Sequence, residues 1–435
     1  MNKIFIRISL FFLIILSFFF SFFIWTNNGS SNRSAIITNK NLTQVDYSRN
    51  LSNLYSPVKI FSVDGNGNKY LLLDELNTIT NMAKTKFKNL DLKKMEMRNA
   101  ESDKQYESII DNYDSVQLYY QSPVSLKILS QKFGFKFDKK SSEFPANRVI
   151  IVRVSPVEKE IYFSNDQTGE YYYINLGLDK TKIFSTANEL KKKVLVEEKK
   201  GSNGYITFFK KKIQLNSYTY LIKTLDDNFY VSNFMTNDGS AGLTFDSKTN
   251  TYKKGLTKSL SINNQNGMVN FQDHHLESSS VPHDLTTLLN LSKEVMQKVG
   301  NSFNSFRYFS NPSYNRVVFC SYIDGFPVFY NEKNGDAFLS WGRSSQQFSF
   351  FNSTLEVPIS TSQNTITLEP TDLLLQKLKN KGIPTNKIQD IQIGYSWVKN
   401  HDSTEVVNLL PQYFVKIKGQ YKEASSLINQ SQGEK

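Results

Sequence analysis

The sequence predicts an α+β protein, with an N-terminal transmembrane helix followed by a multi-domain ectodomain of antiparallel sheets with packed helices. Residues 8–25 form an uncharged apolar run. Downstream, short strand patterns separated by turn sequences dominate, and apolar residues at helical spacing appear only in scattered stretches. The chain lacks the regular alternation of strand and long helix that a doubly wound parallel sheet would need.

The apolar run is long enough to span a bilayer. At a rise of about 1.5 Å per residue, residues 8–25 cover roughly 27 Å. Lys3 and Arg7 precede the run and uncharged residues follow it. The positive-inside rule therefore predicts a single-pass protein of the cell membrane, with a cytoplasmic N-terminus and an extracellular C-terminal ectodomain.

A cleaved signal peptide is the alternative to a membrane anchor, because a basic start before an apolar stretch is common to both. No small-x-small cleavage site follows the run, which favours the anchor. A lipoprotein signal is excluded, since the only cysteine is Cys320. A single cysteine also rules out an intrachain disulfide. The lack of disulfides is usual for a protein exported by a Gram-positive bacterium.

The formal net charge of +12 indicates a basic ectodomain. It falls to +10 when Lys3 and Arg7 are set aside. Outside the cell such a surface suits anionic lipids and wall polymers, and we expect no nucleic acid partner. Dispersed charge that only aids solubility is the alternative.

Shifts in composition divide the chain. Residues 29–56 are rich in Asn, Ser and Thr, and a polar run before Pro282 marks a second boundary. The expected divisions are a cytoplasmic tail and transmembrane helix at residues 1–28, a stalk at 29–56, an N-terminal α+β domain at 57–180, a central mostly β domain at 181–283, a C-terminal α+β domain at 284–420 and a flexible tail at 421–435.

The N-terminal domain is expected to open with a hairpin. The sequence Asp64-Gly65-Asn66-Gly67 separates two apolar strands and tolerates the positive φ of a tight turn. Helical spacing then predicts a helix at residues 74–90. The strands of the hairpin are expected at 58–62 and 69–72, further strands at 115–120, 148–154, 160–164 and 171–176, and a short helix at 124–133.

The central domain is expected to be helical at residues 187–193 and to form strands with little helix at 205–234. In the C-terminal domain, Asp284 is the expected N-cap of a helix at 284–299. An Asp324-Gly325 turn should join two strands. The elements expected after Asp284 are strands at 316–323 and 326–330, a helix at 370–378, and strands at 391–398, 405–410 and 412–418.

No catalytic or metal site is predicted. Asp273, His274, His275 and His283 lack the spacing and companions of a metal site. Cys320 lies in an apolar strand, where a thiol usually behaves as a small buried hydrophobe. The nucleophile motif G-x-S-x-G and the nucleotide motifs are absent. Paired carboxylates stay open, because such pairs meet only in space. We therefore expect a protein that is not an enzyme and holds no cofactor.

Within the apolar run, Ser17 and Ser21 form a candidate contact face. They are four residues apart and so share one side of a helix. Small residues let a second helix approach, and their hydroxyls can bond across the contact. The alternative is a serine hydroxyl bonded to its own backbone.

The C-terminal half carries a family resemblance. Its strand and turn segments are FRYF at 306–309, NRVVF at 315–319, YIDGFPVF at 322–329, IGY at 393–395 and LPQYFVKIKG at 410–419. Together they resemble the YycH (WalH) family of Gram-positive bacteria. Residues 239–252 look like the central domain of that family, and the short tail, single span and length are similar from end to end.

The resemblance implies a three-domain extracytoplasmic regulator with no catalytic residues. Such a protein associates through its membrane helix with the WalK (YycG) sensor histidine kinase and with a sister protein, YycI, and the kinase controls cell-wall metabolism through WalR (YycF). This sequence departs from the family in a Phe-rich span that keeps only Trp25 of a Trp-rich membrane exit. The alternative hypothesis is a membrane-anchored wall-polymer-binding module or wall-processing enzyme.

Overall fold

The computed structural model describes residues 14, 16, 17 and 53–429, apart from residues 74–75, 156–157, 178–182, 203, 236–241, 246–247, 275–280, 300–305, 331–334, 360–363 and 401–402. The described residues from 53 onward belong to one compact unit, separate from the first three. Ile14, Leu16 and Ser17 are helical, and the rest of the predicted span lies outside the described residues. No helix in the described part of the chain is long and apolar enough to cross a membrane.

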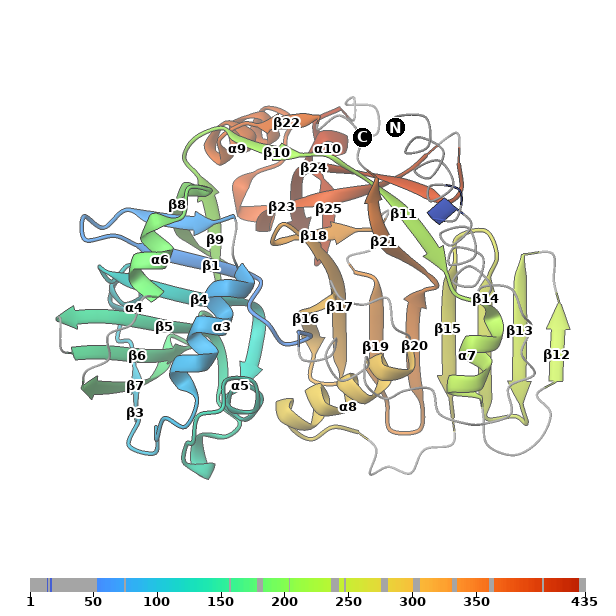
Figure 1. The fold of residues 1–435 in the computed structure, drawn as a ribbon, viewed down its shortest axis with the longest axis horizontal. Helices are drawn as coiled ribbons and strands as arrows, with labels where there is room; N and C mark the ends of the chain where they lie inside the picture. The colour runs from blue at the N-terminus through green and yellow to red at the C-terminus, as the bar shows by residue number, and fades with distance from the viewer. Residues whose placement is uncertain are drawn as a thin grey trace, which may run out of the picture. The chain divides into compact units, whose positions relative to one another are not determined.

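The first sheet is antiparallel throughout (Figure 1). Among the described residues it has nine strands in the order β3-β7-β6-β5-β4-β1-β2-β8-β9. Their bounds are β1 Lys59–Val63, β2 Lys69–Leu72, β3 Glu96–Asn99, β4 Ser115–Ser125, β5 Pro145–Ser155, β6 Glu158–Ser164, β7 Glu170–Gly177, β8 Lys193–Gly201 and β9 Gly204–Phe209.

The predicted N-terminal hairpin is confirmed by the pairing of β1 with β2. The Asp64 carboxylate accepts hydrogen bonds from the backbone N–H groups of Asn66 and Asn68, and Gly67 has φ +83°. Local turn chemistry thus fixes this register.

Four helices accompany the first sheet in the described chain: α3 Leu76–Phe87, α4 Asp103–Ile110, α5 Leu126–Phe133 and α6 Ile183–Glu189. Helix α3 contacts α5 and α6, which both contact β4. It buries Ile79, Ala83 and Phe87 at helical spacing. Ser125 caps α5 by accepting a hydrogen bond from the N–H of Ile128, and Gly134 ends the helix at φ +80°.

The second sheet mixes strands from the expected central and C-terminal domains. Fourteen strands in the described residues follow the order β12-β13-β14-β15-β20-β19-β17-β18-β23-β24-β11-β21, with β16 on β17 and β25 on β24. Only β18 and β23 pair in parallel among these strands. The bounds are β11 Tyr218–Thr224, β12 Gly242–Phe245, β13 Thr249–Lys254, β14 Lys258–Asn263, β15 Met268–Asp273, β16 Phe306–Ser313, β17 Arg316–Ile323, β18 Phe326–Phe329, β19 Ala337–Trp341, β20 Gln346–Phe351, β21 Ser353–Ile359, β23 Ile388–Lys399, β24 Val406–Ile417 and β25 Gln420–Glu423.

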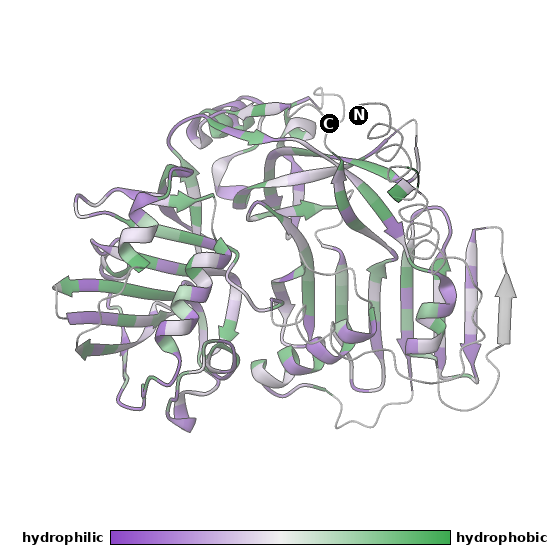
Figure 2. Cartoon of the chain, in the orientation of Figure 1, coloured by the Kyte–Doolittle hydropathy of each residue, from purple (hydrophilic) through white to green (hydrophobic). Residues whose placement is uncertain are grey.

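A small pair of strands, β10 (Ile213–Asn216) and β22 (Thr365–Leu368), completes the β structure of the described chain. The helices of this half are α7 Asp227–Phe234, α8 Leu285–Val299, α9 Thr371–Asn380 and α10 Ala424–Asn429. Asp284 caps α8 as predicted, because its carboxylate accepts a hydrogen bond of 2.6 Å from the N–H of Thr287. Figure 2 shows that inner strands such as β4, β5, β17 and β19 are rich in hydrophobic residues.

The sheets cross the expected domain boundaries. Strands β8 and β9 follow residue 180 yet belong to the first sheet, because β8 pairs with the free edge of β2. Strand β15 precedes residue 283 but pairs with β20 in the second sheet. Pairing between distant segments, which sequence patterns do not encode, therefore decides where each sheet ends.

Three expected elements differ from the structure. Residues 227–234 form helix α7 rather than strand, since Asp226 caps the helix and Tyr230 and Phe234 are buried four residues apart. Residues 187–193 were expected to be helical, but α6 ends at Glu189 and β8 begins at Lys193. Residues 421–429 carry part of β25 and helix α10 in place of a flexible tail, and Tyr421 is buried.

Two strands expected on either side of Pro411 form one strand, β24. Proline has no backbone N–H, so within a sheet it cannot donate a hydrogen bond to the neighbouring strand that its nitrogen faces. Strand β11 pairs with β24 only up to Leu409, and β25 pairs with it only from Phe414. Pro411 lies in the interval between these two partners, so its missing donor leaves no ladder bond broken.

Candidate functional site

Only one of the two serines of the predicted membrane-helix contact is among the residues that the structure describes. Ser17 lies in a helical part of the chain, whereas Ser21 lies outside the described residues. The contact face therefore stays a prediction.

The sequence cluster around Asp273 begins at the end of strand β15. Asp273 ends β15, is 5% exposed and forms an ion pair of 3.3 Å with Lys258. His275 lies outside the described residues and His283 is exposed. Within the described ranges, no three His, Cys, Asp or Glu side chains group as metal ligands.

Cys320 lies in β17 and is fully buried. Burial raises the pKa of its thiol well above the ordinary value, and the nearby Asp336 carboxylate adds to the effect. A protonated buried thiol is a poor nucleophile, so this residue has a packing role.

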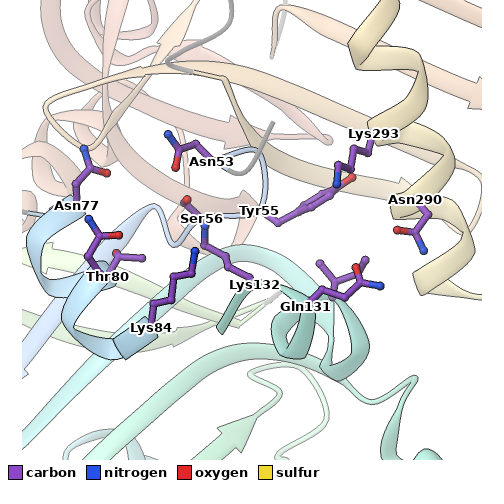
Figure 3. Close-up of a pocket in the computed structure, with 12 residues that line it drawn as sticks. Asn53, Tyr55, Ser56, Asn77, Thr80, Lys84, Gln131, Lys132, Asn290 and Lys293 are labelled. Carbon is purple, nitrogen blue, oxygen red and sulfur yellow. The ribbon is translucent and has the colours of Figure 1, made fainter. Parts of the chain in front are cut away.

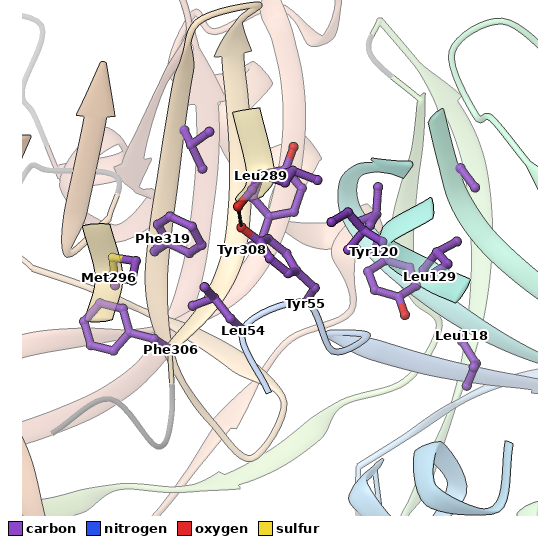
Figure 4. Close-up of a cluster of buried hydrophobic side chains, with 14 of the residues drawn as sticks. Leu54, Tyr55, Leu118, Tyr120, Leu129, Leu289, Met296, Phe306, Tyr308 and Phe319 are labelled. Carbon is purple, nitrogen blue, oxygen red and sulfur yellow. Dashed lines mark hydrogen bonds between the residues drawn. The ribbon is translucent and has the colours of Figure 1, made fainter. Parts of the chain in front are cut away.

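The segment that leads into β1 is held between parts of the two sheets. We call residues 53–57 the junction segment. The Tyr55 hydroxyl donates a hydrogen bond of 2.5 Å to the carbonyl oxygen of Leu289 in α8, and the N–H of Tyr308 in β16 donates one of 2.9 Å to Leu54. Figure 4 shows the Tyr55 ring between the Tyr308 side and the Tyr120 side of this cluster. The junction segment is thus bonded to the C-terminal half of the chain, although in sequence it directly precedes β1 of the first sheet.

Further bonds join the two halves around this point. The Ser125 and Thr286 hydroxyls lie 2.7 Å apart, which links the start of α5 to that of α8. The Tyr308 hydroxyl donates to the carbonyl oxygen of Pro123 at 3.3 Å. Strand β16 and helix α8 also contact β4. One hydrophobic core therefore continues from the first sheet into the second.

A cavity of about 440 Å³ opens beside the junction segment (Figure 3). We call it the basic cavity. Its described lining residues are Asn53, Tyr55, Ser56, Asn77, Thr80, Asn81, Lys84, Ile128, Gln131, Lys132, Asn290 and Lys293. The three lysines come from α3, α5 and α8. Burial lowers the pKa of Lys132 to about 7, and the positive charges of Arg307 and Lys84 contribute.

A second cavity, of about 520 Å³, has a mixed lining of aromatic rings, amides and charged groups. At its wall the Tyr421 hydroxyl donates a hydrogen bond of 2.5 Å to the Asp390 carboxylate, and the Gln121 amide donates one of 3.3 Å. Burial raises the pKa of Asp390 above its ordinary value. Asp390 is thus already engaged by neighbours, and no second carboxylate lies among the described lining residues.

A buried ion network lies within the first sheet. Arg148 is fully buried and donates to Asp166 at 2.7 and 2.9 Å and to Glu198 at 2.8 and 2.9 Å. Lys69 forms a second ion pair with Glu198 at 2.6 Å. Burial alone would raise the pKa of Glu198, but the charges of Arg148 and Lys69 hold it well below its ordinary value. Lys69 also pairs with Asp111 at 2.7 Å, so each buried cation of the network has carboxylate partners.

Sequence patterns gave no signal for the basic cavity. Lys84 and Lys132 lie on predicted helices and Lys293 on a third, with no motif linking them. Arg148 opens the strand predicted at residues 148–154, and a charge next to such an apolar run is a signal for a buried ion pair, although sequence patterns do not assign its partners.

The fold and its sites define a class: a large α+β protein of mostly antiparallel sheets, with a continuous core, paired buried charges and cavities that polar residues largely line. Within that class, residues 205–432 match the family model for the YycH protein C-terminal domain, and the chain belongs to the YycH family. The resemblance expected from the C-terminal segments is confirmed.

A solved structure supports the fold assignment. The crystal structure of YycH from Bacillus subtilis superposes with a TM-score of 0.68 at 15% sequence identity, and covers 86% of this chain and 96% of that chain. At this identity the similarity establishes the α+β fold alone. Comparison with curated proteins gives no match.

Proposed function

We propose that this chain is a non-enzymatic, membrane-anchored regulatory protein of the WalK/WalR (YycG/YycF) two-component system, which controls cell-wall metabolism. The observation that carries the proposal is membership of the YycH family over residues 205–432. Regulation through protein contacts requires no catalytic group. The fully engaged buried charges of the Arg148 network are in keeping with such a role.

Residues 8–25 anchor the protein in the membrane, with the N-terminus in the cytoplasm and the ectodomain outside. The uncharged apolar run after Lys3 and Arg7 supports this topology. Ser17 and Ser21 contact the membrane helix of the kinase, and a YycI-like sister protein joins the complex. The small side chains at these two positions support a close helix approach.

The ectodomain contributes through the junction segment. Tyr55 is bonded to α8, and Leu54 to β16, while β1 follows directly in the first sheet. A displacement of the stalk would therefore act on both halves of the ectodomain together. This gives a route by which the position of the membrane helix and the state of the ectodomain influence each other.

Co-purification tests the proposal. The tagged full chain would be expressed in a Gram-positive host, extracted in a neutral detergent and analysed by mass spectrometry for its partners. We expect a sensor histidine kinase and a sister single-span protein. A variant whose residues 8–25 are replaced by an unrelated single-span helix should lose the kinase. Recovery of wall-polymer enzymes without any histidine kinase would contradict the proposal.

A further inference from the structure

The second cavity lies between the two sheets. Tyr119 and Gln121 of β4 and Tyr205 of β9 line it from the first sheet, and Asp390 of β23 and Tyr421 of β25 line it from the second. The Gln121 amide donates a hydrogen bond of 3.3 Å to the Asp390 carboxylate, which joins the two sheets at the cavity wall. A ligand held in this cavity would therefore contact both halves of the ectodomain.

The charges of this lining balance. Asp390 and Lys416 are the only acidic and basic side chains among its described residues. The Asp390 carboxylate also accepts hydrogen bonds from the Tyr421 hydroxyl at 2.5 Å and from the N–H of Ile391 at 2.8 Å. The Lys416 ammonium lies 5.5 Å from the centroid of the Tyr421 ring. One charge of each sign gives the cavity no preference for an anion or a cation, so its lining favours a neutral ligand.

The lining combines aromatic rings with side-chain amides. Aromatic rings offer apolar surface, which suits the C–H faces of a sugar ring. Amide groups both donate and accept hydrogen bonds, which suits sugar hydroxyls. Apolar walls with a few placed polar groups are typical of sites for small ligands. The rings belong to Tyr119, Tyr205, Phe309, Phe338 and Tyr421, and the amides to Gln121, Gln167, Asn311 and Gln389.

Three polar groups of this lining have no partner among the described residues. Gln167, in the turn between β6 and β7, and Asn311, on β16, make no side-chain hydrogen bond with another described residue. The side-chain carbonyl oxygen of Gln121 is buried and also lacks a hydrogen-bond partner in the described chain. Gln389 differs, because it accepts a hydrogen bond of 2.6 Å from the N–H of Gly419. Amides on both sides of the cavity are thus available to a ligand.

We propose that the second cavity binds a neutral oligosaccharide, with the amides of Gln167 and Asn311 on its hydroxyl groups and the aromatic rings against its C–H faces. The cavity volume of about 520 Å³ admits a di- or trisaccharide. Asp390 is the single carboxylate among the described lining residues, which fits binding rather than hydrolysis, since glycoside hydrolysis uses a pair. This inference does not depend on the proposed regulatory role, because it concerns ligand binding alone.

Calorimetry on the full chain in polyoxyethylene-ether micelles, which contain no sugar, tests the proposal with chitotriose and maltotriose as the probes. We expect at least one of the two sugars to bind, and trialanine, as a neutral-backbone peptide probe, to give no binding heat. The Gln167→Ala, Asn311→Ala double variant should bind the sugar at least about tenfold more weakly, as expected for two lost hydrogen bonds. Gln167 is exposed and Asn311 half-buried, so the melting temperature without ligand should be unchanged.

The Asn228→Ala, Gln376→Ala double variant is the matched control, because it removes two exposed amides, on α7 and α9, that do not line the second cavity. Its binding should equal that of the parent. The sugar should also raise the melting temperature of the parent more than that of the Gln167→Ala, Asn311→Ala variant, since a ligand that binds only the folded chain stabilises it. Absence of binding by both sugars, equal binding by that variant and the parent, or binding of trialanine in place of the sugars overturns the proposal.

Discussion

The Tyr55 hydroxyl donates a hydrogen bond to the carbonyl oxygen of Leu289, across 234 positions of the chain. Tyr55 precedes the first strand of the first sheet, and Leu289 lies in α8 beside the second sheet. The Tyr55 ring also meets the Tyr308 ring edge-on, with centroids 5.9 Å apart. A single side chain of the junction segment thereby ties both halves of the ectodomain together.

Replacing Tyr55 with phenylalanine should lower the free energy of unfolding by about 1 kcal/mol, because the ring packing remains and only the buried hydrogen bond is lost. Urea denaturation of the detergent-solubilised chain measures the change. Tyr113→Phe is the control, since Tyr113 is 62% exposed. Equal stability of the Tyr55→Phe variant and the parent would mean that the bond contributes nothing.

Replacing Arg148 with methionine should lower the free energy of unfolding by about 3 to 5 kcal/mol. The buried Asp166 carboxylate would lose its cation and keep only the hydrogen bond from the Tyr106 hydroxyl, and Glu198 would keep only Lys69. Thermal and urea unfolding would both report the loss. Arg98→Met is the control: Arg98 pairs with Glu96 at 2.8 Å on the exposed surface, and its removal should leave stability nearly unchanged. Similar losses in the two variants would show that burial of the network does not matter.

Asp336 should make stability depend on pH. Burial raises its pKa from 3.8 to about 6 in the folded chain, so the folded state binds the proton more tightly than the unfolded state. Its contribution is fully present below about pH 4 and is lost as the pH rises through about 6, a difference of at most about 3 kcal/mol.

Asp336→Asn removes this ionisation while keeping an oxygen that can accept the hydrogen bond from the N–H of Ser321. Urea unfolding between about pH 4 and about pH 8 should therefore give a flatter stability profile for the variant than for the parent. Parallel profiles for the two chains would contradict the assignment.

The Ser17→Leu, Ser21→Leu variant tests the membrane-helix contact. Leucine keeps the span apolar but fills the close-approach face, and each lost interhelical bond should weaken association with the kinase by about 0.6 to 2 kcal/mol. That corresponds to roughly threefold to thirtyfold per contact. Co-purification and output of the kinase regulon, at equal expression, measure the effect.

The control for that experiment is Phe18→Leu, Phe22→Leu, which alters the neighbouring face of the same helix. Failure of the control with normal behaviour of the serine variant would place the contact on the other face. Normal behaviour of both variants would leave the helix as an anchor only, with regulation carried by the ectodomain.

The sequence by itself determined the local elements. The Asp64–Gly67 turn set the register of β1 and β2, Asp284 set the start of α8, and the Asp324-Gly325 turn joined β17 to β18. Each of these depends on hydrogen bonds and backbone angles within a few residues, so composition and spacing suffice. The YycH resemblance rested on such segments of the C-terminal half.

Only the tertiary structure decided which distant segments meet. It paired β2 with β8 and β15 with β20, gave Arg148 its partners at Asp166 and Glu198, and brought Lys84, Lys132 and Lys293 to one cavity. These contacts follow from how a whole sheet edge or helix face is buried. The residues next to a charged side chain in the sequence do not indicate which distant residue it pairs with. The basic cavity could therefore not be predicted, because its walls come from segments that are close only once both halves have packed on the junction segment.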